Sequence, residues 1–306
     1  MRRLINLFSL AIALVTTPVV AQSTEGSGPA IGTEVFVSTD SDETTVWRVA
    51  GNFDLRNAPD GSRIGVRVEK AWYDPLGLGA HERERIFLQA ADGSGNVNWS
   101  VSVGTDGDTL IGSASINDNK TFRKEAFIER DIVETPIGLE QGLYSTFAGA
   151  AIDLPADEKN VFTLLAGVQE FTGDNVRLHL RGNFVHVLDS DAGLSAQLRT
   201  RYFHSTVPEE YDYFSPEDYG QILPILQMRR FVDGWQLLAV GGIGIQRSTG
   251  TDWKQANYAE ARVISPTQGN WFVSGEAIYS QTPGTNTVVG SGYDYFQARI
   301  GLTHRF

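Results

Sequence analysis

Arginine, glutamine and glutamate alternate with apolar residues in several stretches of this chain. In one stretch, Arg177, His179 and Arg181 alternate with Leu178 and Leu180. A guanidinium group keeps its charge and presents a planar fork of donors, so it can bind a carboxylate or the hydroxyl groups of a sugar. We therefore expect these residues to form one face of a regular element whose other face is apolar.

Alternation with period two predicts β-strands, and Gly, Asp, Asn and Pro interrupt it at regular intervals. About 16 strand-like segments fit between residues 33 and 306. Bacterial single-chain barrels usually have an even number of strands. The predicted fold is all-β: a single antiparallel transmembrane β-barrel of about 16 strands, with 14 as the alternative count. The expected strands include the spanning-length segments 177–186, 194–203, 221–231, 235–246, 271–280 and 293–306, and earlier segments at 34–39, 45–55, 63–72, 85–91, 97–104 and 110–116.

The segment lengths and the aromatic residues favour a membrane barrel over a soluble sandwich. Segments of about ten residues match spanning strands, and aromatic residues gather at their ends, where interfacial girdles lie. The chain ends on Phe306, which resembles the signal that barrel-assembly machinery reads. We expect an outer-membrane protein whose partners include outer-membrane lipid and that machinery. The aromatic residues at segment ends are Tyr202, Phe203, Phe231, Trp235, Trp271, Tyr279 and Tyr293.

The first residues have the pattern of a secretory signal. Arg2 and Arg3 precede an apolar run, and Val19-Val20-Ala21 forms a small-residue cleavage site. We predict a signal peptide over 1–21, a short periplasmic lead-in over 22–32 and the barrel over 33–306. The cysteine count of 0 excludes disulfides, and the net charge of -12 argues against nucleic acid as a partner.

If the apolar face contacts lipid, the polar face must line the lumen, because a charged residue facing lipid is costly. Two interpretations of these inward residues remain open. They could pair with each other and fill space, or they could line a hydrated corridor, for which about 16 strands leave enough width. The lumen-lining candidates are Arg177, Arg181, Gln197, Arg199, Arg201, Arg229, Glu260, Arg262, Glu276 and Arg299.

One motif resembles a known family. The run Tyr213-Phe214-Ser215-Pro216-Glu217-Asp218-Tyr219, followed by Leu223-Pro224, Arg229-Arg230-Phe231 and Gly234-Trp235, is similar to the C-terminal barrel of the cellulose synthase operon protein C family, over about 194–306. The resemblance implies a barrel of about 16 strands that exports a newly made polysaccharide. It also implies that Tyr213, Phe214, Ser215, Pro216 and Tyr219 form a loop at a strand entrance, acting either as a rigid turn or in gating and glycan contact.

Family members usually carry periplasmic helical repeats ahead of the barrel, whereas here we expect the barrel to begin shortly after the predicted cleavage site. Either a separate periplasmic scaffold supplies those repeats and acts with an inner-membrane synthase, or this barrel has a different function. The predicted function is a passive channel for a cellulose-like or poly-N-acetylglucosamine-like exopolysaccharide, as used in biofilms. The alternatives are a general small-solute porin and a plugged structural barrel.

We expect no enzyme activity, catalytic residue, cofactor or metal site. His204 and Ser205, with Glu209 and Glu210 nearby, could in principle form a hydrolase site. Nothing in the sequence orients these two side chains for proton transfer, and no oxyanion partner is identifiable.

Overall fold

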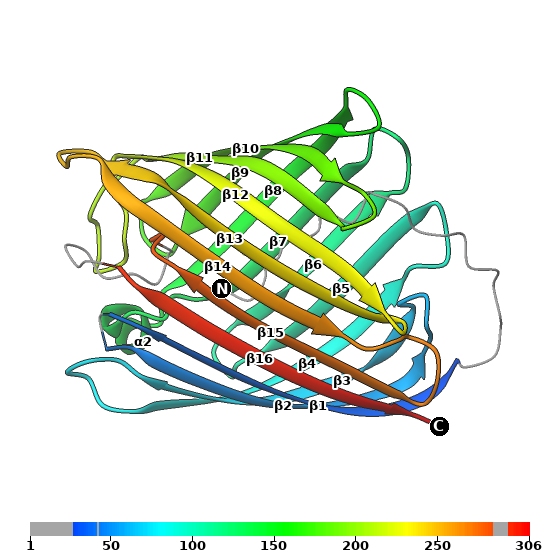
Figure 1. The fold of residues 1–306 in the computed structure, drawn as a ribbon. Coiled ribbons are helices and arrows are strands. Elements are labelled where there is room, and N and C mark those ends of the chain that lie inside the picture. The colour runs from blue at the N-terminus through cyan, green and yellow to red at the C-terminus, as the bar shows by residue number, and fades with distance from the viewer. Residues whose placement is uncertain (1–26, 42, 284–292) are drawn as a thin grey trace.

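The structure is a computed structural model that describes residues 27–41, 43–283 and 293–306. Sixteen strands form one closed antiparallel barrel, as predicted. Each strand pairs with its neighbours in sequence, and β1 pairs with β16 to close the ring (Figure 1). The strands are β1 (Gly28–Asp40), β2 (Thr45–Asn57), β3 (Arg63–Asp74), β4 (His81–Asp92), β5 (Val97–Thr105), β6 (Leu110–Asp118), β7 (Lys124–Ile132), β8 (Tyr144–Pro155), β9 (Asn160–Phe171), β10 (Val176–Asp189), β11 (Leu194–Ser205), β12 (Asp218–Val232), β13 (Trp235–Ser248), β14 (Lys254–Ile264), β15 (Trp271–Ser280) and β16 (Tyr295–Arg305).

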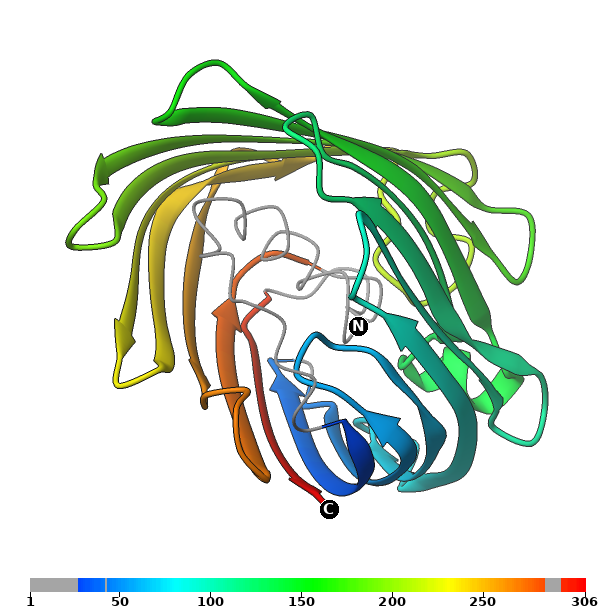
Figure 2. The same cartoon turned by 90° about the vertical axis from the view of Figure 1, so that its right-hand side faces the viewer.

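The outer face of the barrel is apolar and the inner face is largely polar. Along β10, Leu178 and Leu180 are 50% and 56% exposed, whereas the alternating Arg177 and Arg181 are buried. Closure removes sheet edges, so every strand can satisfy its backbone groups within the ladder. A closed barrel with this distribution is the architecture of bacterial outer-membrane proteins. The strands enclose an interior that is visible along the barrel in Figure 2.

The two ends of the barrel differ in their connections. β1 begins and β16 ends at one end, where β12 and β13 are joined by only Asp233 and Gly234. Longer connections, 133–143 and 206–217, lie at the other end (Figure 1). Outer-membrane barrels have short periplasmic turns and longer outer loops. By this rule, the end with the longer loops is the outer end.

The connection 133–143 contains the short helix α2 (Pro136–Gln141). The Thr135 hydroxyl accepts a hydrogen bond from the Gly138 N–H and caps the first turn. Gly142 ends the helix in the left-handed conformation, with φ of 69°. No described helix is long and apolar enough to cross a membrane.

Two details differ from the sequence predictions. The first strand begins at Gly28, so residues 28–32 belong to the barrel wall rather than to a lead-in. Their sequence, Gly-Pro-Ala-Ile-Gly, is small and contains no polar residue, so no apolar–polar alternation marks it as a strand. The backbones of residues 30–32 nevertheless pair with β16 and β2 and complete the closure. Phe203, expected in an outer aromatic girdle, instead faces inward and is fully buried. The expected signal peptide, 1–21, lies outside the described residues.

Candidate functional site: the barrel interior

The sequence-predicted lumen residues lie on the inner register of their strands. Directly paired residues face the same side of a sheet, and Arg181 pairs with Arg201, Arg262 with Glu276, and Glu276 with Arg299. The buried members are Arg177, Arg181, Gln197, Arg199 and Glu260. Arg201, Arg229, Arg262, Glu276 and Arg299 are partly exposed.

Ion pairs fill the interior side of β1, β3, β4 and β7. Arg67 contacts Glu34 at 3.1 Å and Glu69 at 2.5 Å. Arg85 contacts Glu69 at 3.1 Å and Asp131 at 2.5 Å. We call these five residues the ion-pair network. They join four strands through side chains that are mostly shielded from water.

Arg48 and Glu134 form a further inward ion pair that the sequence reasoning missed. The signal was present, because Val46, Arg48 and Ala50 alternate with outward residues in β2. Glu134 had no such signal, since it lies in the connection after β7, outside any strand. Only the fold brings this connection over the inner face of β2.

A smaller charged cluster lies on β14 and β15. Arg262 contacts Glu260 at 2.9 Å and Glu276 at 2.7 Å. The Tyr258 hydroxyl donates to Glu260 at 2.7 Å. Three of the predicted lumen residues thus pair with one another. This agrees with the interpretation that inward charged residues pair and fill the interior.

The arginines of β10 and β11 have different surroundings, because aromatic rings hold them. The Arg177 guanidinium lies 4.9 Å from the Phe171 ring centre and 4.4 Å from that of Phe203. Arg201 lies 5.4 Å from the Phe203 ring centre and 5.6 Å from that of Tyr219. Cation–π contacts of this kind fix the orientation of a guanidinium without neutralising it.

Arg181 and Arg199 repeat this arrangement at other positions. Arg181 lies 5.6 Å from the Phe147 ring centre, and Arg199 lies 5.2 Å from that of Tyr258. The Arg199 Nε also donates to Gln197 Oε1 at 3.2 Å, and Gln197 donates to Gln227 at 3.1 Å. Arginine, amide and aromatic groups therefore form one continuous inner surface on this side of the barrel.

The loop predicted from the family motif is folded inward at the outer end. We call residues 206–217 the motif loop. The Tyr213 ring stacks on Phe171 with centres 4.3 Å apart, and its hydroxyl accepts a hydrogen bond from Asn175. Burial raises the pKa of the Tyr213 phenol to about 12, so it stays protonated at neutral pH. The Phe214 carbonyl accepts a hydrogen bond from Arg177.

The remaining motif residues anchor the same loop. Ser215 and Pro216 are buried, and the Ser215 hydroxyl accepts from the Glu209 N–H at 3.0 Å. Tyr219 is the second residue of β12 and stacks on Phe203 with ring centres 5.0 Å apart. The motif thus supplies a rigid turn with aromatic anchors. The separate expectation of gating or glycan contact stays a prediction.

A second contact joins the motif loop to the α2 connection. The Asp212 carboxylate accepts hydrogen bonds from the Thr135 hydroxyl at 2.6 Å and from the Ile137 N–H at 2.8 Å. We call this contact the outer latch. It ties two long outer loops together over the interior.

His204 and Ser205 do not form a catalytic pair. Adjacent residues in a strand face opposite sides of the sheet, and Ser205 is buried inside with its hydroxyl accepting from Arg177. The His204 Nδ1 instead lies 3.1 Å from Asp218. The two side chains therefore point away from each other.

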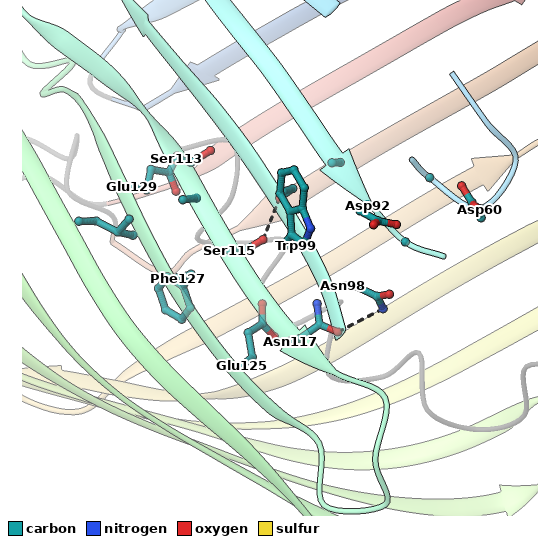
Figure 3. Close-up of a pocket in the computed structure, with 16 residues that line it drawn as sticks. Asp60, Asp92, Asn98, Trp99, Ser113, Ser115, Asn117, Glu125, Phe127 and Glu129 are labelled. Atoms are coloured by element: carbon teal, nitrogen blue, oxygen red, sulfur yellow. Dashed lines mark hydrogen bonds between the residues drawn. The ribbon is translucent and has the colours of Figure 1, made fainter. Parts of the chain in front are cut away.

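The side chains of the described residues do not fill the whole interior. A cavity of about 400 Å³ lies between β4 and β7 toward the end where the chain ends (Figure 3). Ser113 and Ser115 border it with Glu125, Phe127 and Glu129. Small inward side chains on β5 and β6 leave this space. A second cavity, of about 270 Å³, lies beside the ion-pair network.

Phe306, the predicted barrel-assembly signal, follows the last strand and is 75% exposed. Its N–H donates to the Pro29 carbonyl at 2.9 Å, next to the barrel closure. The aromatic side chain remains accessible at this end of the molecule. Its role in assembly stays a prediction.

Comparison with known proteins identifies similar folds but no family. A scan against family models found no match, and a search of curated proteins found none. Among solved structures, a bacterial polysaccharide outer membrane secretin is 13% identical, with a TM-score of 0.63, over 90% of this chain and 98% of that chain.

Two Pseudomonas aeruginosa barrels are also similar, at lower scores. OccK7 (OpdD) is 8% identical with a TM-score of 0.46, over 93% of this chain and 99% of that one. OccK5 (OpdH) is 11% identical with a TM-score of 0.42, over 94% and 100%. At 13% identity, the similarity to the secretin concerns the fold alone. This chain shares the fold of an outer-membrane barrel.

Proposed function

We propose that this chain is an outer-membrane channel through which a polysaccharide leaves the cell. The observation that supports the proposal best is the inner surface of β10 to β12, where buried or partly buried arginines and amides lie beside aromatic rings, including that of Tyr258 from β14. Sugars offer hydroxyl groups to such donors and apolar ring faces to aromatic side chains. Many weak contacts of this kind let a chain slide without trapping it.

The fold is compatible with this role. A barrel of 16 strands is wide enough for an aqueous passage, unlike one of about eight strands, which side chains fill. The similar secretin is itself described as a polysaccharide protein of the outer membrane. The family resemblance of the motif loop adds the expectation of a cellulose-type or amino-sugar cargo.

In this proposal the protein binds the glycan along its inner surface and catalyses no reaction. Synthesis at the inner membrane would push the glycan outward, and a separate periplasmic scaffold would guide it to the end with the short turns. The motif loop and the outer latch would define the exit. The barrel would hold the polymer through reversible contacts only.

A general porin and a plugged structural barrel are the two alternative functions. In a general porin, small solutes would pass through the same wide barrel. In a plugged barrel, the ion-pair network and the inward motif loop would block the interior. Single-channel conductance of the refolded chain in planar bilayers separates the three, with cello- and glucosamine-type oligosaccharides added on either side. The proposal predicts a conductance that glycans interrupt. A conductance indifferent to every glycan would favour a porin, and no conductance would favour a plugged barrel.

A further inference from the structure

The inner surface of the barrel is electrostatically asymmetric. No Asp or Glu of β9 to β13 is buried, whereas five arginines of these strands face inward. Buried carboxylates lie instead on β2, β3, β7, β8 and β14, and in the outer connections. We call the five arginines the arginine wall: Arg177, Arg181, Arg199, Arg201 and Arg229.

Neutral groups hold the two wall arginines whose contacts are best defined. Arg177 donates to Gln169, Ser205 and the Phe214 carbonyl. Arg201 donates to the Pro283 carbonyl at 3.2 Å, and its Nε is buried without a hydrogen-bond partner among the described residues. No carboxylate of the described chain forms an ion pair with either. Desolvating a cation without a countercharge is costly, so an anion supplied from outside would be favoured here.

The wall extends along the passage. Arg177 pairs with Ser205 on β11, and the Ser205 N–H bonds to the Glu217 carbonyl just before β12. Arg229 follows about 12 residues later, which is roughly 40 Å of strand at about 3.4 Å per residue. Arg181 and Arg201 are direct neighbours between these ends. The positive charge therefore forms a strip and not a single pocket.

The arginines of this strip differ in exposure and therefore in the role that we assign to them. Arg177 is fully buried and fixes the motif loop. Arg201 and Arg229 are partly exposed to the interior, so a passing chain can reach them. Clustered cations along a low-dielectric wall attract anions over several ångströms, and the guanidinium fork fits a carboxylate with two parallel bonds.

We propose that the arginine wall binds the carboxylates of an acidic, uronate-bearing polysaccharide. This inference rests on the proposed export function, but it replaces the neutral or amino-sugar cargo that the motif resemblance implies with an anionic one. Carboxylates at repeated positions would pass from one arginine to the next. A cationic glucosamine polymer would be repelled by the same surface.

The test measures block of the single-channel current of the wild-type chain by three sets of oligosaccharides of equal length. These are oligogalacturonates, cello-oligosaccharides and glucosamine oligosaccharides. We expect oligogalacturonates to bind at least roughly 10-fold more tightly than the neutral set, the change that one charge-assisted hydrogen bond supplies. That preference should shrink as salt rises, because salt screens charge.

Substitutions in the arginine wall test whether these residues cause the block by oligogalacturonates. R201Q/R229Q should weaken oligogalacturonate block by roughly 100-fold if each arginine contributes about one such bond, while R201K/R229K should lose less because the charge remains. K70Q removes a cation from the outer surface, where Lys70 pairs with Glu82, and should change nothing. Heat-modifiable migration in gels checks that each variant is folded, and the wild-type arms stand even if a variant fails to fold.

The possible outcomes distinguish failure of the acidic-cargo inference from failure of the proposed export function. Equal block by acidic and neutral glycans, or an equal effect of K70Q, would overturn the acidic cargo and leave export standing. Current that no glycan interrupts, together with anion selectivity in a KCl gradient, would overturn export and leave an anion-selective porin.

Discussion

Replacing Glu69 with glutamine tests whether the ion-pair network stabilises the first strands of the barrel. The Glu69 carboxylate is 1% exposed and lies 2.5 Å from Arg67 and 3.1 Å from Arg85. Glutamine keeps the shape of the side chain but removes its charge and one of its two acceptor oxygens. One of these two contacts must therefore be lost, and the other weakened.

The size of the destabilisation depends on the carboxylates that Arg67 and Arg85 keep after the substitution. A hydrogen bond to a charged group contributes about 1.5 to 3 kcal/mol. Arg67 keeps Glu34 at 3.1 Å, and Arg85 keeps Asp131. Neither arginine is left without a carboxylate, so the cost should fall below the upper end of the range for a broken buried pair. We expect E69Q to lower the free energy of unfolding by about 2 to 4 kcal/mol.

Urea unfolding in lipid vesicles, followed by tryptophan fluorescence, measures this change. The matched control is E82Q, because Glu82 pairs with Lys70 at 2.6 Å on an exposed surface, where an ion pair contributes little. E69Q should unfold at clearly lower urea concentration than E82Q. If the two variants unfold together with the wild type, the network does not stabilise the barrel and the argument is wrong.

Three further predictions follow from individual contacts. D212N should loosen the outer latch, since an amide replaces a carboxylate that accepts two hydrogen bonds; the open-channel current should fluctuate more, and unchanged current noise would contradict a role for the latch. G112A should destabilise the barrel by about 1 to 3 kcal/mol, because Gly112 has φ of 140° and a Cβ would lie 2.0 Å from the Ser102 carbonyl; an unchanged urea midpoint would refute this. The chain has no cysteine, so S115C, which borders the larger interior cavity, should react with a water-soluble thiol reagent from the lumen, whereas I116C should stay unreactive on the lipid face, where Ile116 is exposed; equal reactivity of both would contradict the inward register.

The alternation of residue types made the barrel predictable from the sequence. Leu178 and Leu180 against Arg177 and Arg181 give the strand, its two faces and its approximate length. Sixteen such segments gave the strand count. Alternation fails where a segment has small residues and no polar ones, which is why the start of β1 at Gly28, in Gly-Pro-Ala-Ile-Gly, was missed. There the backbone pairing with β16 determines the strand.

The contents of the interior were only partly predictable. The inward set followed from alternation, but the partners of each side chain depend on contacts across the barrel. Arg67 meets Glu34 from a strand 33 positions earlier, while Arg201 meets aromatic rings. Mutual pairing of inward residues therefore describes the charged clusters of β1, β3, β4, β7, β14 and β15. A hydrated corridor along the other side of the barrel stays a prediction.

The outer loops were the least predictable part. The helix α2 is only six residues long, too short for a periodic apolar pattern. Its position depends on a carboxylate from the motif loop, Asp212, which is 75 residues from Ile137 in the chain. Phe203 was misplaced for a related reason, because an aromatic residue at a strand end can serve either the lipid interface or the anchoring of an inward loop.

The most direct test of the central claim is polysaccharide release from proteoliposomes that contain the refolded chain. Fluorescent linear glycans and a branched dextran of equal mass are enclosed together, and their efflux is measured. The account predicts that a linear glycan escapes through the barrel while the dextran is retained. Release of monosaccharides alone, with every linear glycan retained, would contradict an export conduit and indicate a small-solute porin.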